Sequence, residues 1–444
     1  MRNALVHSQI DHTPVSKLHD QDWMNSTETL KVISALSASG TKVRFVGGCI
    51  RDALSKRKVE DIDIGTPDPP ETVLNLLKAH KIKAVPTGIS HGTITALINN
   101  KKFEITTLRR DVKTDGRHAN VSFSEDWIID AKRRDFTINA LSATPKGLIY
   151  DPFQGITDLK NGKVTFIGHP EDRINEDYLR IIRYYRFNGI FSKRFSKNQS
   201  REACRKAAPH LVALSKERIR DELFKILLID NPAKIIQIMK DDGILEIILP
   251  EAKNIKQLNT LNKIQTQILK TKYVRLEPIL SLAALTNVDL EETISMTRRL
   301  RLSKIQSHHF RKLSLSETRI NPDMGEISEL KFFQHAEADF ILSLILLAWS
   351  KELCRNVKIS SDRARKWSSF LERSRKFLKI NFPITGKDVM DLGITSGPLV
   401  GLILMAVEGW WKNDGLTANR QECLNRLKKE IEIRNKSAKH LEVL

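Results

Sequence analysis

The sequence predicts an α+β protein, with strands in the N-terminal part and helices after it. Residues 43–46, 92–98 and 103–108 have the β-branched and alternating patterns of strands, and residues 99–102 indicate a hairpin turn. A β-turn segment is expected at residues 149–155 and 159–163, and beyond it apolar residues recur at helical spacing. A run of strands followed by a run of helices indicates the α+β class, and 444 residues suffice for about three domains.

The first elements are expected to be a loose leader at residues 1–24 and helices at residues 26–39 and 71–80. The leader lacks an apolar h-region and carries acidic residues, which argues against a secretory or transit peptide. The longest apolar run, residues 340–349, is half the ~20 residues that a membrane span needs, so no membrane segment is expected.

Residues 45–64 (FVGGCIRDALSKRKVEDIDI) place a glycine pair between a strand and a helix. Since glycine has no Cβ, the N–H groups of Gly47 and Gly48 can approach an anion at the positive end of the helix. Arg51 adds a guanidinium that can hold phosphate. A glycine pair alone is common by chance, so this phosphate site depends on its context.

The same stretch ends in a strand whose period of two puts Asp61 and Asp63 on one face. Adjacent carboxylates facing a triphosphate imply a divalent metal, and Mg²⁺ is expected. Glu104, on the strand at 103–108, is either a third metal ligand or an exposed strand glutamate. Residues 109–124 are polar and lack periodicity, which predicts a mobile loop leaving the sheet.

A helix expected at residues 127–141 contains Arg133-Arg134-Asp135. An arginine there can hold phosphate and a carboxylate can accept from a ribose 2′-OH, although a salt-bridged helix face is the alternative. A further helix at 176–187 (EDYLRIIRYYRF) repeats charged residues every three positions, so that neighbours share a face. These residues are Asp177, Arg180, Arg183 and Arg186, and the alternative is a basic amphipathic helix with an i,i+3 ion pair.

An Asp/Arg pair such as Asp177 and Arg180 has a definite preference among bases. A carboxylate only accepts and a guanidinium only donates, so the pair matches an exocyclic amine beside a ring-nitrogen acceptor, as in cytosine and adenine. Uracil and guanine offer a carbonyl and a ring N–H, a costly mismatch in a water-poor pocket. The pair would therefore admit CTP and ATP and reject UTP and GTP.

The charge balance favours a polyanionic partner, since 73 Lys and Arg residues against 53 Asp and Glu give a formal net charge of +20. Basic patches bind phosphates irrespective of sequence, although a solvated basic surface is the alternative. The four cysteines are widely spaced and form no CxxC pair, which predicts neither a disulfide framework nor a zinc site. A reducing compartment, the cytoplasm, is expected.

In their order, these motifs resemble the bacterial and mitochondrial CCA-adding enzymes, the class II tRNA nucleotidyltransferases of the poly(A) polymerase and CCA-transferase family. GG-x-x-RD followed by D-x-D resembles motif A of nucleotidyltransferases related to DNA polymerase β, and E-D-x-L-R-x-x-R resembles the motif that reads the incoming base. HGTIT and TDGRHA look like the CCA-adding branch, and the arginine-rich strand associated with bacterial poly(A) polymerases is not apparent. The likeness runs from about residue 43 to the C-terminus and is dense through Phe187.

The resemblance implies a DNA polymerase β-like head with a mixed β-sheet, followed by a helical neck, body and tail. The expected divisions are 25–145 for the catalytic head, 146–230 for the neck that reads the base, and 231–444 for a tRNA-binding body and tail. It also implies that a tRNA 3′-hydroxyl attacks the α-phosphate of CTP twice and then of ATP, with pyrophosphate leaving.

The roles that the resemblance implies are metal binding by Asp61 and Asp63, triphosphate binding by Gly48 and Arg51, sugar and phosphate binding by Arg134 and Asp135, base recognition by Asp177 and Arg180, and further nucleotide contacts by Arg183 and Arg186. Three alternatives remain open: a poly(A) polymerase, a CC-only enzyme, and a non-catalytic RNA-binding module. The intact acidic pair argues against the last.

Overall fold

The computed structural model describes residues 13–114, 119–195, 198–269, 277–315, 320–335, 337–355, 361–395 and 397–441. The chain divides into two compact units. Unit 1 comprises residues 1–252 with 299–301, and unit 2 comprises residues 253–298 with 302–444.

Unit 1 is built on an eight-stranded mixed sheet, which confirms the α+β class and the mixed sheet of the head. The strand order is β1-β10-β9-β2-β3-β6-β5-β4, in which β3 and β6 are parallel and the other neighbours are antiparallel. The strands of the sheet are β1 (Ser16–Lys17), β2 (Arg44–Val46), β3 (Ile62–Thr66), β4 (Lys83–Gly88), β5 (Thr93–Ile98), β6 (Lys101–Thr107), β9 (Ser142–Ala143) and β10 (Leu148–Tyr150).

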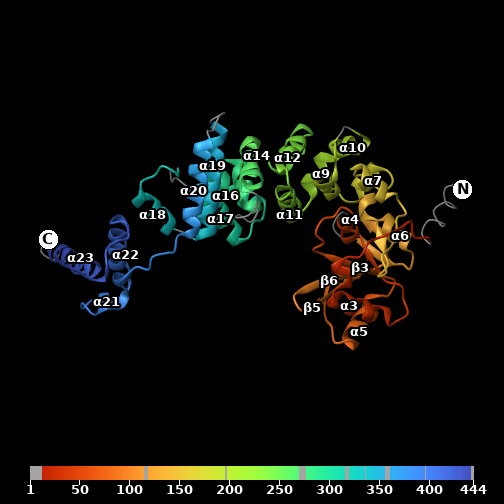
Figure 1. Cartoon of the computed structure of the whole chain (residues 1–444), viewed down its shortest axis with the longest axis horizontal. Coiled ribbons are helices and arrows are strands. Elements are labelled where there is room, and N and C mark those ends of the chain that lie inside the picture. The colour runs from red at the N-terminus through yellow and green to blue at the C-terminus, as the bar shows by residue number, and fades with distance from the viewer. Residues whose placement is uncertain are drawn as a thin grey trace. The chain divides into compact units, whose positions relative to one another are not determined.

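Helices α3 (Thr27–Ser37) and α5 (Pro70–Ala79) pack against each other and lie on the same side of the sheet (Figure 1). Both are amphipathic, and Val32 of α3 and Val73 of α5 are almost fully buried. Their apolar faces share one core with Ile64 of β3. Because side chains alternate along a strand, this core fixes which face of β3 is left for polar residues.

Two expectations about the N-terminal part are wrong. Residues 16–17, expected in a loose leader, form β1, which pairs with β10, and Leu18 is buried in the core. Residues 109–124, expected to be a loop, contain the antiparallel strands β7 (Arg109–Thr114) and β8 (Ala119–Phe123). Polar strands that pair only with each other, in a separate two-stranded sheet, carry little hydrophobic periodicity, so the sequence did not indicate them. Residues 1–12 and 115–118, the latter inside the TDGRHA run, lie outside the described residues.

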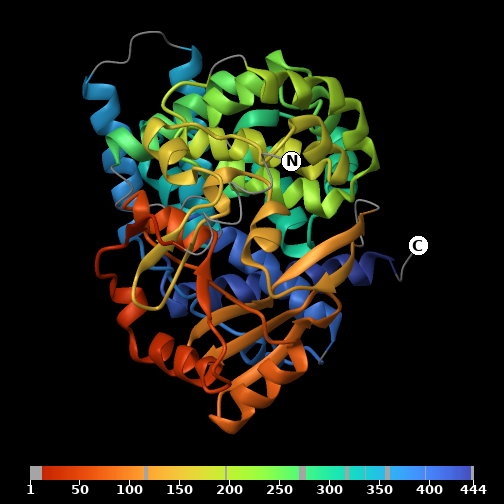
Figure 2. The ribbon, with the colours of Figure 1, turned by 90° about the vertical axis from the view of Figure 1, so that its right-hand side faces the viewer.

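Apart from β7 and β8, the rest of unit 1 is mainly helical, and helices α9 to α12 lie at one end of the sheet (Figure 2). Residues 159–161, expected in a turn, belong to a helix, because the chain from residue 155 continues in helical conformation up to Gly162. Phe136, just beyond helix α6 (Trp127–Lys132), packs on Phe166 with ring centroids 4.8 Å apart, and Phe166 stacks on Tyr184 of α9 at 5.5 Å. This buried aromatic cluster joins α9 to the segment that follows α6. The helices of unit 1 not yet given are α2 (Asp22–Asn25), α4 (Gly48–Leu54), α7 (Gly155–Asn161), α8 (Pro170–Glu176), α9 (Leu179–Phe191), α10 (Gln199–Ala207), α11 (Lys216–Leu227), α12 (Pro232–Asp241) and α13 (Leu245–Ile248).

Two expected helices are interrupted at their charged motifs. The helix expected at 127–141 ends at Lys132, and a 3₁₀ turn follows at Thr137–Asn139. The helix expected at 176–187 is two helices, because Asp177 has an extended backbone (φ −158°, ψ 106°) between α8 and α9. The Asp177 side chain accepts from the Leu179 N–H at 3.1 Å, a local hydrogen bond that competes with helix continuation.

Unit 2 is helical, as expected, and among its described residues no strand is found. Trp349 of α19 stacks on Trp367 of α20 with centroids 5.9 Å apart, and Trp411 anchors a separate core in α22 and α23. The helices are α14 (Ile255–Lys263), α15 (Pro278–Thr286), α16 (Leu290–Arg299, whose last residue belongs to unit 1), α17 (Lys304–Ser314), α18 (Glu326–His335), α19 (Ala338–Arg355), α20 (Ser361–Lys376), α21 (Gly386–Met390), α22 (Pro398–Asn413) and α23 (Arg420–Leu441). In the described part of the chain, no helix has the length and apolar character to cross a membrane.

Candidate active site

A cleft of about 610 Å³ in unit 1 is lined by β3, β6, α4, the segment after α6, α9 and α11. All ten site residues predicted from the sequence line it: Gly48, Arg51, Asp61, Asp63, Arg134, Asp135, Asp177, Arg180, Arg183 and Arg186. The other described lining residues are Glu104, Arg133, Asn139, Leu179, Phe187, Arg218 and Lys225. Eight cationic side chains and five carboxylates therefore face one cavity, a composition suited to a phosphate-bearing ligand.

The glycine pair forms the turn between β2 and α4, and Gly47 is the glycine that this turn requires. Its φ of 71° is in the left-handed region, and a Cβ there would lie 2.6 Å from Nη1 of Arg134. A Cβ on Gly48 would make only an ordinary contact, 3.6 Å from Nη2 of Arg51. Gly47 thus lets Arg134 approach the turn, while Gly48 lines the cleft.

Arg51 is held rigidly at the edge of the cleft. Its Nη1 donates to Oδ1 of Asn139 at 2.5 Å, and its Nε and Nη2 form a fork to Asp52 at 2.9 and 2.8 Å. The guanidinium also lies over the rings of Phe187 and Phe191, at 5.0 and 4.9 Å. A side chain restrained on all sides loses little entropy when it binds an anion.

Three carboxylates meet at the β3 end of the cleft. Ile62 and Ile64 point into the core, so Asp63 takes the opposite face, with Asp61 just before the strand. The parallel pairing of β3 with β6 places Glu104 in register with Asp63. Glu104 is therefore beside the acidic pair, as the third-ligand alternative required, and it is also exposed.

Burial, followed by the negative charges of Glu104 and Asp61, raises the pKa of Asp63 to about 6. Arg134 and Arg51 act in the opposite direction. Repulsion among oxygen donors of this kind is relieved by a hard divalent cation, so the donor set fits Mg²⁺. Among the described residues, no three His, Cys, Asp or Glu side chains are already arranged as a closed metal site.

The Arg133-Arg134-Asp135 motif lies at the C-terminal end of α6 and just beyond it. Asp130 accepts from Arg133 Nε at 2.8 Å and from Arg134 Nη2 at 3.2 Å, which fixes both guanidinium groups. Asp135 is 6% exposed, and its carboxylate accepts from the Phe136 N–H at 2.9 Å, from Asn139 Nδ2 at 2.8 Å and from Arg183 Nε at 2.7 Å. With about four lone-pair sites on a carboxylate, roughly one remains for a ligand hydroxyl.

The predicted pair of Asp177 and Arg180 is not a pair in the structure. Oδ2 of Asp177 accepts from Nη2 of Arg218 at 2.7 Å, from α11. Arg180 instead donates to Oε2 of Glu176 at 2.7 Å and to the carbonyl of Arg133 at 3.0 Å. The ion-pair alternative is thus wrong for these two residues, and each enters the cleft with a different partner.

Arg183 and Arg186 share a buried acidic partner. Glu222 of α11 is 3% exposed and accepts from Nε of Arg186 at 2.6 Å, with Nη1 of Arg183 at 3.7 Å. Burial alone would raise the pKa of Glu222, but the charges of Arg186 and Arg183 hold it below its ordinary value. This carboxylate orients two arginines of α9 toward the cleft.

Four polar residues that the sequence analysis did not predict line the cleft, and only two of them lie within a recognised motif. Arg133 and Asn139 are adjacent to predicted residues, within RRD and FTINAL. Arg218 and Lys225 lie on α11, whose ordinary amphipathic pattern marks a packing helix and nothing more. Only their position in the fold brings these two side chains to the cleft.

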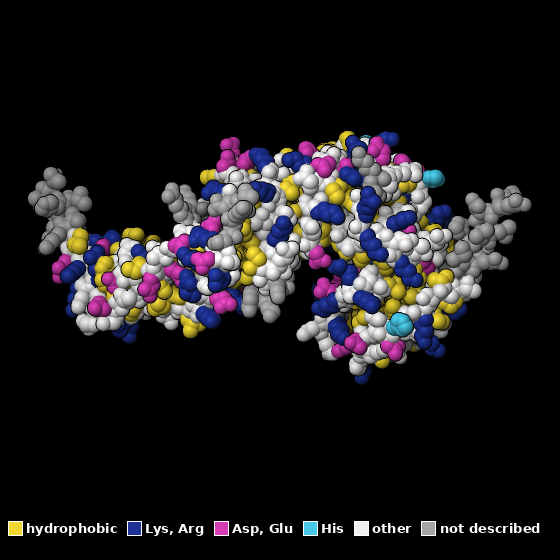
Figure 3. Space-filling view, turned by 45° about the horizontal axis from the view of Figure 1, so that its top comes forward, with side chains coloured by type: hydrophobic (Ala, Val, Ile, Leu, Met, Phe, Trp, Pro, Cys, Tyr) yellow, Lys and Arg dark blue, Asp and Glu magenta, His cyan; other side chains and the backbone are white. Residues whose placement is uncertain are grey.

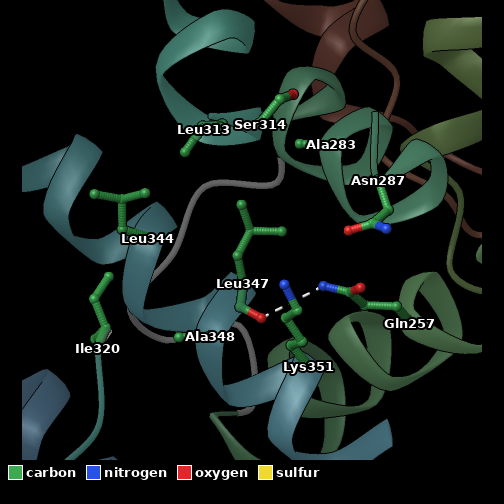
Figure 4. A pocket seen from close by; sticks show the side chains of 10 residues that line it. All are labelled: Gln257, Ala283, Asn287, Leu313, Ser314, Ile320, Leu344, Leu347, Ala348 and Lys351. Carbon is green, nitrogen blue, oxygen red and sulfur yellow. Dashed lines mark hydrogen bonds between the residues drawn. The ribbon is translucent and has the colours of Figure 1, made fainter. Parts of the chain in front are cut away.

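Unit 2 has a cavity of its own, of about 130 Å³, between α14, α15, α17 and α19 (Figure 4). Of the described residues that line it, Lys351 alone is charged, and Nε2 of Gln257 donates to the carbonyl of Leu347 at 3.5 Å. Its described lining residues include no carboxylate for a metal and no cluster of arginines for a triphosphate, so the unit 1 cleft is the candidate active site.

Two family models match the chain. A "Poly A polymerase head domain" model matches residues 43–165, and a "Probable RNA and SrmB-binding site of polymerase A" model matches residues 197–256. The first match contains the glycine turn, strands β3 and β6 with their carboxylates, and the RRD motif. The second match contains α10, α11 and α12.

Similar proteins cover nearly the whole chain. CCA tRNA nucleotidyltransferase 1, mitochondrial, of Mus musculus is 33% identical over 408 residues, 91% of this chain and 90% of the mouse protein. The CCA-adding enzyme of Streptococcus gordonii is 31% identical over 390 residues, 86% of this chain and 92% of that protein. The crystal structure of the Bacillus stearothermophilus CCA-adding enzyme in complex with CTP is 24% identical and superposes with a TM-score of 0.70 over 92% of this chain and 98% of that one, which establishes a shared fold.

Proposed function

Because the chain belongs to the family of CCA tRNA nucleotidyltransferases, we propose that it adds CCA to the 3′ end of tRNA from CTP and ATP, with release of pyrophosphate. The relatives are named CCA tRNA nucleotidyltransferase and CCA-adding enzyme, and the match spans at least 86% of this chain in each. The observation that carries the proposal is the cleft, where all ten residues predicted from separate motifs lie together.

The acidic end of the cleft is the proposed metal site. Nucleotidyltransferases of this family use a divalent metal, and we propose Mg²⁺ held by Asp61 and Asp63, with Glu104 beside them. When bound, such an ion makes a hydroxyl a better nucleophile and stabilises charge on phosphate oxygens. Burial, followed by the charges of Glu104 and Asp61, raises the pKa of Asp63, and a bound cation would favour its ionised form, which supports this placement.

The arginines are proposed to bind and orient the nucleotide. Gly48 and Arg51 would contact the triphosphate, and Arg134 and Asp135 the phosphate and sugar. Since Arg51 and Arg134 are already held by Asn139 and Asp130, they need little rearrangement to do so. The tRNA 3′-hydroxyl then attacks the α-phosphate in a fixed geometry, which is how positioning accelerates a reaction between two bound partners.

The base is proposed to be read by Asp177 and Arg180, with Arg183 and Arg186 as further contacts. One acceptor and one donor fit both cytosine and adenine, so a single site serves both nucleotides. Protein side chains thereby replace a nucleic-acid template.

The tRNA body is proposed to bind the basic surface, which Figure 3 shows as Lys and Arg side chains distributed over both units. We also propose the functional divisions 25–145, 146–230 and 231–444 for catalysis, base recognition and tRNA binding. All four cysteines are free thiols, which supports a reducing compartment, and we propose the cytoplasm.

Incubating the protein with tRNA that lacks CCA and with each labelled nucleotide tests the proposal. We expect two additions from CTP, one subsequent addition from ATP, and none from UTP or GTP. The name of the head-domain model makes a poly(A) polymerase the second candidate. Repeated additions from ATP alone would identify it, and additions that stop after two cytidines would identify a CC-only enzyme.

A further inference from the structure

Arg218 lies on α11, outside every motif recognised in the sequence, yet it contacts the base-reading carboxylate directly. Its Nη2 donates to Oδ2 of Asp177 at 2.7 Å, and the two side chains are 33% and 25% exposed. Oδ1 of Asp177 accepts from the Leu179 N–H at 3.1 Å. The carboxylate is therefore held at both oxygens, and its plane is fixed.

The other base-reading group is positioned separately. Arg180 is 12% exposed and is held by Glu176 and by the carbonyls of Arg173 and Arg133, at 2.7, 3.0 and 3.0 Å. In the described residues, no side-chain hydrogen bond joins Asp177 to Arg180. Arg180 therefore cannot be what orients Asp177.

We propose that Arg218 is a positioning residue that orients the Asp177 carboxylate and thereby sets the discrimination against UTP and GTP; the inference rests on the proposed function. Of about four lone-pair sites on the carboxylate, Leu179 and Arg218 occupy two. The remaining sites accept the exocyclic amine of cytosine or adenine. A carboxylate held in this orientation cannot turn away from the carbonyl of uracil or guanine, so the acceptor-to-acceptor mismatch is enforced.

Without Arg218, one oxygen of Asp177 loses its charged partner and the side chain can rotate about its χ angles. Rotation relieves the mismatch with the wrong bases and weakens the contact with the right ones. The loss of Arg218 should therefore change the ratio of kcat/KM between the right and the wrong nucleotides. A direct contact between Arg218 and a phosphate would instead affect all four nucleotides equally, because they share the triphosphate.

The test measures kcat/KM for all four nucleotides with the full chain and tRNA lacking CCA. The variants are Arg218→Ala, Arg218→Lys, Asp177→Ala and the Arg218→Ala/Asp177→Ala double variant. Arg220→Ala is the matched control, since Arg220 is on the same helix, pairs with Asp221 at 2.7 Å and does not line the cleft. Urea unfolding of each variant checks that the fold is retained.

We expect Arg218→Ala to lower the CTP-to-UTP and ATP-to-GTP ratios roughly tenfold, the value of one charged hydrogen bond. The double variant should discriminate no worse than Asp177→Ala alone, because Arg218 acts through Asp177. Arg218→Lys should keep part of the CTP-to-UTP and ATP-to-GTP discrimination, since the lysine ammonium can still donate to Asp177. If the alanine variant unfolds, the lysine variant provides the test. Arg220→Ala should keep the original ratios.

Unchanged ratios in Arg218→Ala and Arg218→Lys would overturn the inference. So would a uniform rise in KM for all four nucleotides, or additive effects in the double variant, since either outcome would mean that Arg218 contacts the ligand itself. If the unsubstituted protein transfers no nucleotide to tRNA, the proposed function fails. If it adds CCA while the Arg218 variants discriminate normally, only the present inference fails.

Discussion

Nε of Arg183 donates to Oδ2 of Asp135 at 2.7 Å, across 48 residues of sequence. Asp135 belongs to the motif proposed to hold the sugar, and Arg183 belongs to the helix proposed to hold the base. One ion pair therefore joins two parts of the proposed nucleotide site, and a change in either residue should affect both stability and binding.

Arg183→Ala should destabilise unit 1 by about 1–3 kcal/mol at pH 7, a value below that of a fully buried pair because Arg183 is 30% exposed. Burial alone would raise the pKa of Asp135, but the charge of Arg183 and the hydrogen bonds from Asn139 and Arg183 hold it below 3.8. A lowered folded-state pKa contributes stability that is present above about pH 4 and lost as the pH falls through that pKa.

The difference in urea midpoint between the original protein and Arg183→Ala should accordingly be largest near neutral pH and shrink below about pH 4. Lys58→Ala is the control, since Lys58 is 85% exposed and its pair with Glu60 spans 3.6 Å. A pH-independent difference would show that Arg183 stabilises by packing alone.

Asp63→Ala and Asp61→Ala should each reduce nucleotide transfer by at least about a hundredfold, because the metal's charge stabilisation is worth several kcal/mol. Binding of tRNA should stay nearly intact. Glu60→Ala is the matched control, since Glu60 precedes Asp61 but does not line the cleft. Near-normal turnover in either aspartate variant would refute the metal assignment.

Asp177→Ala should weaken discrimination against UTP and GTP by roughly tenfold to a hundredfold, the usual value of a well-made polar contact in selectivity. Arg180→Ala should act similarly but lower the overall rate more, because it also releases Glu176 and the carbonyl of Arg133. Ratios of kcat/KM for the four nucleotides measure both effects. If both variants keep the original ratios, these residues do not read the base.

Gly47→Ala should lower activity more than Gly48→Ala. The first substitution strains a backbone with φ of 71° and places a methyl group 2.6 Å from Nη1 of Arg134, whereas the second makes an ordinary contact. A shifted Arg134 should raise KM for the nucleotide. Equal kinetics in the two variants would mean that Arg134 does not depend on the turn.

The logarithm of the tRNA binding constant should fall linearly as the logarithm of the salt concentration rises. Contact with on the order of six phosphates gives a slope of roughly −4 to −5. The net charge of +20 is the basis of this expectation. The affinity for CTP in the absence of tRNA, measured in parallel as a control, should depend on salt less steeply. A binding constant for tRNA that does not change with salt would show that phosphates are not the main contact.

Local patterns were enough to predict ten residues that line the cleft proposed to bind the nucleotide. The period of two along Asp61–Ile64 sets which side chains share a face whatever surrounds the strand, and Gly47 marks a turn because other residues avoid its φ. Motif order along the chain then identified the family. These features depend on neighbours in sequence, so the sequence alone determined them.

Tertiary structure decided what each charged group pairs with. Asp177 and Arg180 are three residues apart and would share a face of one helix, but the chain bends at Asp177, and Arg218 reaches it across 41 residues of sequence. Strand register likewise sets Glu104 beside Asp63. These pairings depend on how α11 and β6 pack against the rest of unit 1. The burial of their apolar faces determines which polar side chains meet, and a local sequence pattern does not predict that outcome.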